Sequence, residues 1–183
     1  EELGISTTGS VVARTEEEAV EIFKSLASPV ALKVLSPDVV HKSDAGGVKL
    51  HLNEENDVRR AYRDIVSSFQ GKLVEGISVQ KMAPTGIEAI VGVANDPTFG
   101  PVLMFGLGGV FVEVLKDVSF RSIPITRSDA QEMIEEIRGY SLLKGSRGHS
   151  ADIEALKDLL MRISDFVNLE PSIWEMDLNP VFL

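Results

Sequence analysis

The chain has 183 residues, 44% hydrophobic and 25% charged, which is the balance of an ordinary globular protein with one domain or two small lobes. Its formal charge of −10, from 28 acidic and 18 basic residues, argues against a nucleic acid partner, because binding a duplex needs clustered Lys and Arg. The absence of Cys excludes disulfides and thiolate metal sites, and no apolar run approaches the roughly 20 residues that span a bilayer, so we expect a cytoplasmic protein with no membrane partner.

The first half of the chain alternates between predicted helices and strands. A helix is predicted from Thr15 to about residue 28, because Thr15 and Glu18 match a capping box and Pro29 forbids continuation. Periodicity and turn residues then predict an apolar strand at 30–35, a strand with one wet face at 48–52 and a second helix capped by Asn53. Together these elements predict a βαβ-like lobe over about residues 10–80.

The second half of the chain changes topology. Turn residues around 84–86 and 95–97 separate short apolar runs, as in an antiparallel meander. The expected elements are strands at 77–82, 87–93, 102–105 and 110–115, a helix capped by Ser128 and Asp129, and a last helix that buries Ile153, Leu156, Leu160, Ile163 and Val167. The fold class is therefore α+β, in two lobes of residues 1–82 and 83–183.

The segment 173–180 carries the most specific pattern. Strand alternation sends Glu175, Asp177 and Asn179 to one face and Trp174, Met176 and Leu178 to the other. Carboxylate and amide oxygens are the ligands of Mg²⁺, which commonly keeps one or two carboxylates together with phosphate oxygens. The row predicts the floor of a metal–nucleotide site, although an edge strand whose polar face meets water would show the same pattern.

Two cations and a histidine suggest anion chemistry. Lys33 lies in an otherwise apolar strand, where its ammonium needs an anion such as a nucleotide phosphate, unless the side chain reaches the lobe edge. His41 lies in a loop rich in hydroxyl and charged side chains, which makes it a candidate nucleophile for a phosphoryl group or a general base, although most loop histidines are inert. Arg147, in the basic loop 144–148, is able to hold phosphate by two hydrogen bonds, or is simply solvated.

The glycine-rich segment 105–109 does not match the common nucleotide fingerprints. It leads into the strand-like run 110–115, where a dinucleotide-binding motif or a P-loop requires a helix, and a P-loop also requires a Gly-Lys-Ser/Thr ending. Glu88 lies within a predicted strand and must face solvent or pair with a cation or metal. These features alone leave the type of nucleotide site open.

Taken in order, the motifs resemble one family. They are Leu32 to Val48 with the loop Ser-Pro-Asp-Val-Val-His-Lys-Ser-Asp-Ala-Gly-Gly, Val79 to Met82, Glu88 to Gly92, Asp96 to Pro101, Phe105 to Asp117, Leu143 to Gly148, and Glu175 to Pro180. This series resembles the ATP-grasp (β) part of ADP-forming acetyl-CoA synthetases, which are relatives of succinyl-CoA synthetase. The resemblance covers the whole chain and implies a two-lobed ATP-grasp fold with mixed or antiparallel sheets and the nucleotide cleft between the lobes.

The resemblance also implies a reaction and roles. The reaction is acetyl-CoA + ADP + phosphate ⇌ acetate + CoA + ATP, an acid–thiol ligase activity with ATP/ADP and Mg²⁺ as cofactors. By analogy, Lys33 contacts phosphates, Gln80, Lys81 and Met82 form the hinge beside adenine, and Glu88 lies in the cleft. Arg147 meets phosphate, Asp177 and Asn179 lie on the Mg²⁺ side, and His41 takes phosphate from an α-side phosphohistidine and passes it to ADP.

The same resemblance implies what this chain needs from elsewhere. The CoA site and the first phosphohistidine belong to an α subunit or domain, so we expect a hetero-oligomer or a fragment of a longer chain. The family continues through a C-terminal hairpin with a further metal-binding Asp, which this sequence lacks, so the chain alone should bind nucleotide poorly and should not complete the reaction. Two alternatives remain open: the ATP-grasp nucleotide-sensing module of a multidomain protein acetyltransferase, and a ligase that forms an acyl phosphate directly, with His41 merely structural.

Overall fold

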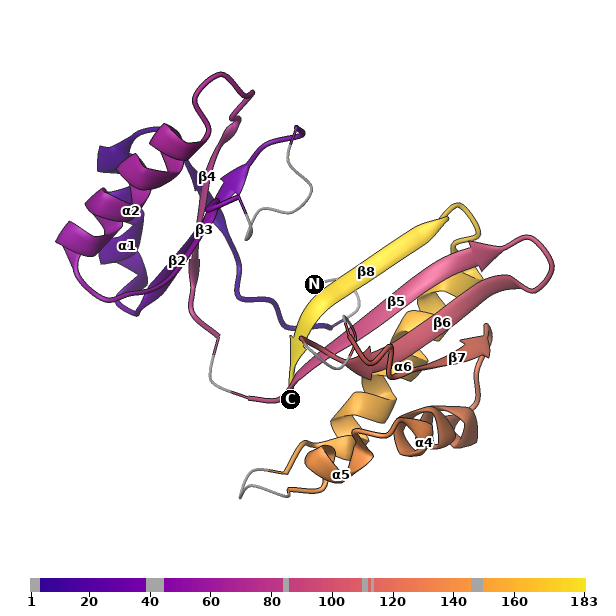
Figure 1. Cartoon of the computed structure of the whole chain (residues 1–183). Coiled ribbons are helices and arrows are strands. Elements are labelled where there is room, and N and C mark those ends of the chain that lie inside the picture. Colours follow the sequence, from indigo (N-terminus) through magenta and orange to yellow (C-terminus); the bar gives the residue numbers. More distant parts are fainter. Residues whose placement is uncertain (1–3, 39–44, 84–85, 110–111, 113, 146–149) are drawn as a thin grey trace. The chain divides into compact units, whose positions relative to one another are not determined.

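The computed structural model describes residues 4–38, 45–83, 86–109, 112, 114–145 and 150–183. The chain divides into two compact units. The N-terminal unit comprises Ser6–Ala83, and the C-terminal unit comprises Pro84–Leu183 together with Glu1–Ile5. Figure 1 shows the strands and helices of each unit.

The N-terminal unit is a four-stranded sheet covered on one face by two helices (Figure 1). The strand order is β1 (Val11–Ala13), β4 (Gly76–Lys81), β2 (Val30–Leu35) and β3 (Val48–Leu52), and all neighbours are antiparallel. Helices α1 (Glu16–Leu26) and α2 (Glu55–Ser68) pack their apolar stripes on this sheet. The core includes Ala19, Val20, Leu32, Val34, Val58, Ala61, Ile65, Ile77 and Val79.

The chain connections explain the βαβ-like pattern of this unit. Helix α1 joins β1 to β2, which run parallel to each other with β4 between them, and α2 joins β3 to β4 with β2 between them. The two helices and strands β2, β3 and β4 were therefore predicted correctly, whereas β1 was not predicted. However, the sheet contains only antiparallel neighbours among the described residues, because each crossover skips one strand position.

The first helix begins as predicted and the second does not. Thr15 Oγ1 accepts a hydrogen bond from the Glu18 amide at 3.1 Å, and the Glu18 carboxylate accepts one from the Arg14 amide at 2.7 Å. Asn53 does not cap α2; its side chain donates to the His51 carbonyl at 2.8 Å, and the N-cap residue is Glu54 without a side-chain bond. The prediction for Asn53 was wrong because its amide stabilises the end of β3 instead.

A bulge in β3 changes which of its side chains face water. Val30 pairs with Leu52 whereas Leu32 pairs with Lys49, so two residues of β3 lie opposite one residue of β2. The extra residue is accommodated at His51, which has a φ of 57°. Leu50 is consequently 50% exposed, whereas simple alternation predicted that it shares a face with Leu52.

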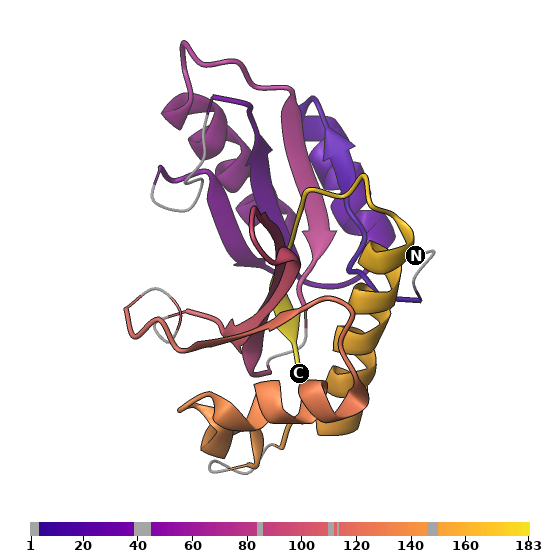
Figure 2. The ribbon, with the colours of Figure 1, turned by 90° about the vertical axis from the view of Figure 1, so that its right-hand side faces the viewer.

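The C-terminal unit is a second antiparallel sheet with helices on one side (Figures 1 and 2). The strand order is β7 (Val118–Ser122), β6 (Gly100–Leu107), β5 (Glu88–Asp96) and β8 (Glu175–Phe182). Helices α4 (Arg127–Glu136), α5 (Tyr140–Leu143) and α6 (Ile153–Leu169) cover the side that carries the core. The core includes Ala89, Val91, Val93, Leu103, Phe105, Leu107, Met133, Ile134, Leu156, Leu160, Ile163 and Val167.

The caps of α4 and α6 are side chains close to the helix starts. Thr126 Oγ1 accepts from the Asp129 amide at 3.2 Å, and the Asp129 carboxylate accepts from the Thr126 amide at 2.7 Å. The helix therefore starts two residues earlier than a cap at Ser128 would allow. Asp152 caps α6, the helix whose apolar stripe was predicted correctly. In the part of the chain that the structure describes, no helix has the length and apolar character needed to cross a membrane.

The strand predicted at 110–115 is not present in its described residues. Val112 is helical, with its amide bonded to the Gly109 carbonyl at 3.2 Å, and Val114 and Leu115 form a turn. The strand that pairs with β6 is instead β7, which the sequence pattern did not predict. The prediction of a strand directly after the glycine-rich segment was therefore wrong. A dinucleotide-binding fold is excluded by the antiparallel sheet instead, because that fold is built on a mostly parallel sheet.

Candidate functional site

In the N-terminal unit, Lys33 lies on the sheet face that the helices do not cover. Its neighbours Leu32 and Val34 belong to the core beneath the helices, so alternation turns Lys33 the other way. Its cross-strand partners are Ser78, which is 5% exposed, and Val48. Lys33 is half-buried as a residue, and within the described residues its ammonium has no ion pair and no side-chain hydrogen bond. It is thus free to meet an anion.

The three residues predicted to line the hinge have different environments. Gln80 pairs with Ala31 and shares the uncovered face with Lys33. Lys81 pairs with Val30 and is exposed on the other side of the strand. The amide of Met82 already donates to the Pro29 carbonyl at 2.9 Å. The structure therefore brings only Gln80 to the face of Lys33.

In the C-terminal unit, the polar row of β8 faces away from the core. Met176, Leu178 and Val181 pack against the core, whereas Glu175, Asp177 and Asn179 are exposed. The predicted alternation is confirmed over these residues. Trp174 is an exception, because it precedes β8 and is 70% exposed.

A bulge ends the polar row at Asn179. Ala89 pairs with Val181 and Val91 pairs with Leu178, so Asn179 and Pro180 together lie opposite Ile90. The peptide bond between Asn179 and Pro180 is cis. Without the bulge, Val181 would point away from the core, so the extra residue permits both the polar row and the apolar end of the strand.

The uncovered face of this sheet has apolar side chains at one edge, a glycine in the middle and oxygen ligands at the other edge. One row across the four strands consists of Phe120, Met104, Gly92 and Asp177, in that order. At about 4.8 Å per strand, Phe120 and Asp177 lie about 14 Å apart. Gly92 has no side chain, and Met104 Cε lies 3.2 Å from where a Cβ on Gly92 would stand, so the Met104 side chain lies beside it.

Glu88 lies on the same face, at one end of the sheet. It begins β5, its side chain is exposed, and its carbonyl accepts a hydrogen bond from the Gly108 amide at 2.7 Å. Alternation places it on the side of Gly92, about 13 Å further along the strand. Within the described ranges, neither Glu88 nor Asp177 has a side-chain partner.

The donor chemistry of Asp177 and Asn179 fits Mg²⁺ that is mostly coordinated by other ligands. One carboxylate and one amide oxygen are available, both exposed and without side-chain partners in the described part of the chain. The described residues contain no group of three or more His, Asp and Glu side chains that would hold a metal alone. Water or phosphate oxygens would have to complete the shell, as is common for Mg²⁺.

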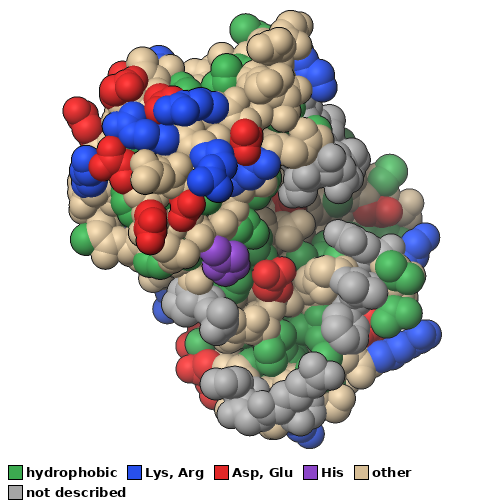
Figure 3. Space-filling model, turned by 60° about the vertical axis from the view of Figure 1, so that its left-hand side comes forward, with side chains coloured by type: hydrophobic (Ala, Val, Ile, Leu, Met, Phe, Trp, Pro, Cys, Tyr) green, Lys and Arg blue, Asp and Glu red, His purple; other side chains and the backbone are tan. Residues whose placement is uncertain are grey.

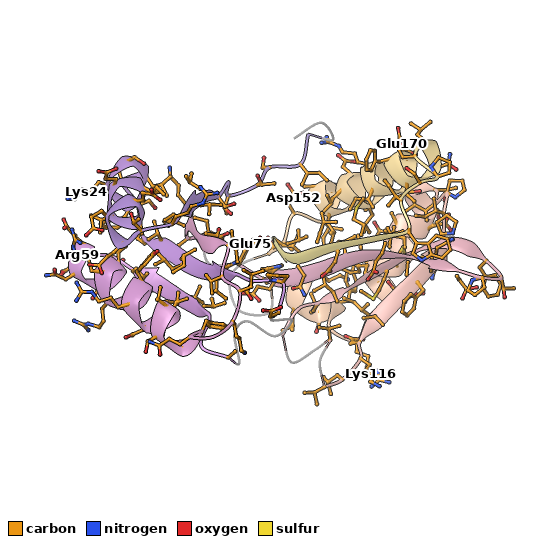
Figure 4. The ribbon with its side chains drawn as sticks, turned by 90° about the horizontal axis from the view of Figure 1, so that it is seen from above. Lys24, Arg59, Glu75, Lys116, Asp152 and Glu170 are labelled. Carbon is orange, nitrogen blue, oxygen red and sulfur yellow. The ribbon has the colours of Figure 1, made fainter. Side chains whose placement is uncertain are left out.

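By contrast, the charged side chains above the helices neutralise one another. Glu16 pairs with Arg63 at 2.7 Å and with Arg59 at 3.0 Å, and Glu55 pairs with Lys24 at 2.7 Å and with Arg59 at 2.9 Å. Hydrogen bonds from Arg63 and then Arg59 lower the pKa of Glu16 from 4.5 to about 2. Figure 3 shows acidic and basic side chains interleaved on this surface, and Figure 4 shows Lys24 and Arg59 on the helices.

Two predicted site residues, His41 and Arg147, lie outside the described residues, so the structure does not place them. The sequence analysis also missed Ser78 beside Lys33, and it missed Gly92. An isolated glycine within an apolar strand was a usable signal for Gly92, because such a glycine often marks a close approach by a ligand or another backbone.

The sequence was compared with protein families and with known proteins. The model of the ATP-grasp domain family matches residues 1–183. ADP-forming acetate–CoA ligase I of Archaeoglobus fulgidus is 52% identical over 99% of this chain and 27% of its own length. The β subunit of ADP-forming acetate–CoA ligase I of Pyrococcus furiosus is 46% identical over 98% of this chain and 79% of its own. This chain thus spans about a quarter of the Archaeoglobus protein and most of the separate β subunit.

Solved structures of an acetyl-coenzyme A synthetase from Ca. Korarchaeum cryptofilum are similar as well. The complex with coenzyme A, Ca-AMPCP and HgCl⁺ superposes with a TM-score of 0.93 at 49% identity, over 99% of this chain and 81% of the other. A second complex, with coenzyme A and Mg-AMPPCP, has a TM-score of 0.83 at 49% identity over 99% and 80%. In this complex the phosphohistidine segment points towards the nucleotide binding site.

Proposed function

Because this chain belongs to the ATP-grasp domain family, we propose that it is the nucleotide-binding β part of an ADP-forming acyl-CoA synthetase. The reaction is acetyl-CoA + ADP + phosphate ⇌ acetate + CoA + ATP. The identity of about half of the residues to acetate–CoA ligases over the full chain supports this choice within the family.

One structural observation carries the proposal. Within the described residues, Lys33 has no counter-ion on the uncovered face of one sheet, and Glu88 and Asp177 have no side-chain partner on the uncovered face of the other. Lys33 is half-buried, so the lack of a counter-ion costs more there than at the exposed carboxylates of Glu88 and Asp177. A magnesium nucleotide supplies the missing partners, because its phosphates are anionic and its metal takes oxygen ligands.

Each group then has a task in nucleotide binding. Lys33 neutralises phosphate, and Gln80 offers an amide beside it on the same sheet face. The segment around Lys81 and Met82 borders the adenine, with the Met82 amide committed to Pro29 and unavailable to the base. Glu88 hydrogen-bonds the nucleotide at the end of β5. Arg147 holds the transferred phosphoryl group by a fork of two hydrogen bonds.

Asp177 and Asn179 would hold Mg²⁺ by their side-chain oxygens. When bound, this ion neutralises charge on the phosphates during transfer. Asp177 is the only ionised ligand of the pair, so it contributes most of the electrostatic attraction to the ion, while the Asn179 amide oxygen fixes the direction from which the second ligand approaches. Their place on a paired strand, beside a bulge, keeps both oxygens on one side of the sheet.

His41 is the relay residue in this proposal. One imidazole nitrogen attacks the phosphorus of a phosphohistidine on the α part, a new N–P bond forms, and the old N–P bond breaks. A terminal oxygen of the ADP β-phosphate then attacks the same phosphorus, which releases His41 and gives ATP. The catalytic contribution of the protein is positioning and charge neutralisation. In the Korarchaeum complex a phosphohistidine segment points towards the nucleotide binding site, which supports delivery of phosphate to that site but does not distinguish a relay through His41 from direct transfer.

The chain acts with a partner in this proposal. The α part carries the CoA site and the first phosphohistidine, either on a separate subunit in a hetero-oligomer or in the same polypeptide. Both arrangements occur among its relatives, since the Pyrococcus protein is a β subunit and the Archaeoglobus protein is about four times longer than this chain. We place the enzyme in the cytoplasm, where ADP and acyl-CoA are found.

The proposal is tested by phosphate labelling. The chain, with its α part, is incubated with Mg²⁺ and ATP labelled at the γ-phosphate, and we expect an acid-labile, base-stable phosphoprotein that is lost in His41→Asn. His51→Asn is the matched control, because His51 is an exposed strand residue. Labelling that persists in His41→Asn would rule out the relay and favour direct acyl-phosphate chemistry. Nucleotide binding without any label would favour a sensing module.

A further inference from the structure

Ser78, in the middle of β4, is a buried residue with a hydroxyl group. It lies between Ile77 and Val79, which belong to the core beneath the helices, so alternation turns its side chain to the uncovered face of the N-terminal sheet (Figure 1). The residue is 5% exposed, although serine is usually a surface residue. A buried polar side chain at a strand position is informative, because an apolar residue would pack there without any demand for a hydrogen bond.

The hydroxyl of Ser78 has no hydrogen-bond partner within the described residues. Those residues contain no fully buried side-chain oxygen or nitrogen that lacks a partner, so Ser78 Oγ retains a small area that is open to solvent. The accessible part of this side chain is therefore its hydroxyl, which is able to donate one hydrogen bond and to accept others.

This lack of a partner distinguishes Ser78 from comparable residues. In the part of the chain that the structure describes, each of the other buried polar or charged residues has a side-chain hydrogen bond or an ion pair. They are Ser36, Asp117, Ser119, Lys157 and Ser164. A structural role explains these five side chains, whereas no contact of the described chain explains the hydroxyl of Ser78.

The neighbours of Ser78 are polar on one side and apolar on the other. Lys33 is its partner on β2, and Gln80 follows two residues later on β4, so the three side chains share the uncovered face. Side chains directly opposite each other in an antiparallel pair have Cβ atoms about 4.5–5.5 Å apart. On the other side Val12 of β1 pairs with Ser78. Ser78 thus lies between an apolar side chain and a lysine without a counter-ion.

Resting on the proposed function, we infer that the Ser78 hydroxyl donates a hydrogen bond to the nucleotide phosphate that Lys33 neutralises. A phosphate group has several oxygens, so one accepts from Ser78 while another meets the Lys33 ammonium. A hydrogen bond to a charged group is stronger than one between neutral groups. The two residues contribute differently: the lysine is a flexible point charge, whereas the short serine side chain, on a strand paired on both sides, fixes direction.

The test measures the affinity of Ser78→Ala for nucleotide without turnover. Isothermal titration of the assembled enzyme with Mg-ADP gives Kd, and adenosine, which carries no phosphate, is titrated in parallel. Ser119→Ala is the matched control, because Ser119 is also a buried serine on a strand. Ser119 pairs with the core residue Phe105 and so faces the helices of the C-terminal unit. Differential scanning calorimetry gives Tm for each variant.

We expect Ser78→Ala to raise the Kd for Mg-ADP about ten-fold or more. Its Kd for adenosine and its Tm without nucleotide should equal those of the wild type, because the hydroxyl has no partner in the described protein. Ser78→Thr, which keeps a hydroxyl, should bind Mg-ADP more tightly than Ser78→Ala. Ser119→Ala should leave the Kd for Mg-ADP unchanged and lower Tm, because it removes the donor to the Phe105 carbonyl.

A double variant tests whether Ser78 and Lys33 bind the same phosphate. Losses from residues that share a partner are not additive in free energy. We expect the rise in Kd for Ser78→Ala combined with Lys33→Met to be smaller than the product of the two single rises, because without Lys33 the phosphate is no longer held against the hydroxyl. A rise equal to that product would overturn the shared phosphate.

The other outcomes are also distinguishable. A wild-type assembly that binds Mg-ADP, with the same Kd in Ser78→Ala, overturns the inference alone. An equal loss of affinity for Mg-ADP and for adenosine overturns it as well, because the hydroxyl would then contact the nucleoside or support the fold. A wild-type assembly that binds no Mg-ADP overturns the proposed function, and the role of Ser78 with it.

Discussion

Replacing Lys33 by Met removes the charge predicted to bind phosphate and keeps a long apolar side chain. The structure gives the ammonium no partner among the described residues, so nothing in the ligand-free protein depends on it. A hydrogen bond to a charged group contributes about 1.5–3 kcal/mol. Since each 1.4 kcal/mol is a factor of ten in affinity, the Kd for Mg-ADP should rise about ten- to hundred-fold.

The thermal stability of Lys33→Met without nucleotide should rise or stay the same. Lys33 is half-buried and has no partner among the described residues, and Met keeps a similar volume without the charge. We therefore expect the Tm of Lys33→Met without nucleotide to equal or exceed that of the wild type. Loss of affinity together with retained stability is the pattern of a binding residue.

Lys49→Met is the matched control for this experiment. Lys49 lies on the neighbouring strand and pairs with Leu32, which faces the helices, so the two lysines are on opposite faces. Isothermal titration of each assembled enzyme with Mg-ADP gives Kd, and differential scanning calorimetry gives Tm. An unchanged Kd for Lys33→Met, or an equal loss in Lys49→Met, would refute the assignment of Lys33 to phosphate.

Two further predictions concern the metal and pH. Asp177→Asn should raise the Mg²⁺ concentration needed for half-maximal ATP formation, because it removes the only charged ligand. Glu175→Gln, one row further along the same face, should leave that concentration unchanged. If a magnesium titration gave the same half-maximal Mg²⁺ concentration for both variants, it would argue against the site. Because hydrogen bonds from Arg63 and Arg59 lower the pKa of Glu16 to about 2, its contribution to stability is complete above about pH 4.5 and is lost as the pH falls towards 2. Chemical denaturation should accordingly show a stability difference between wild type and Glu16→Gln that shrinks over this range; a constant difference would contradict the ion pairs.

Local sequence patterns predicted most of the helices and strands. The helix from Thr15, the stripe of α6 and the polar row of β8 each depend on near neighbours in the chain, through capping or through the 3.6- and 2-residue periods. The ordered motifs also identified the family, because they cover the whole chain. The chemistry of Lys33, Glu88 and Asp177 followed from side-chain type and strand position alone.

The wrong predictions occurred where pairing between segments distant in the sequence decides the local structure. The bulges at Leu50 and Asn179 shift the register against partners far along the chain, which no local pattern encodes. The run 110–115 has the β-branched composition of a strand, yet β6 pairs with β7 instead, so tertiary pairing overrode propensity.

The sequence by itself determined which groups are available for chemistry, because residue type and strand period fix what each face offers. Only the tertiary structure decided which of those groups remain unpaired and which side chains share a row. Glu16 and Lys33 are both charged residues on amphipathic elements, but helix packing brings two arginines to Glu16, and no element of the described chain brings a carboxylate to Lys33. The row from Phe120 to Asp177 has the same physical origin, since only strand pairing brings these residues together.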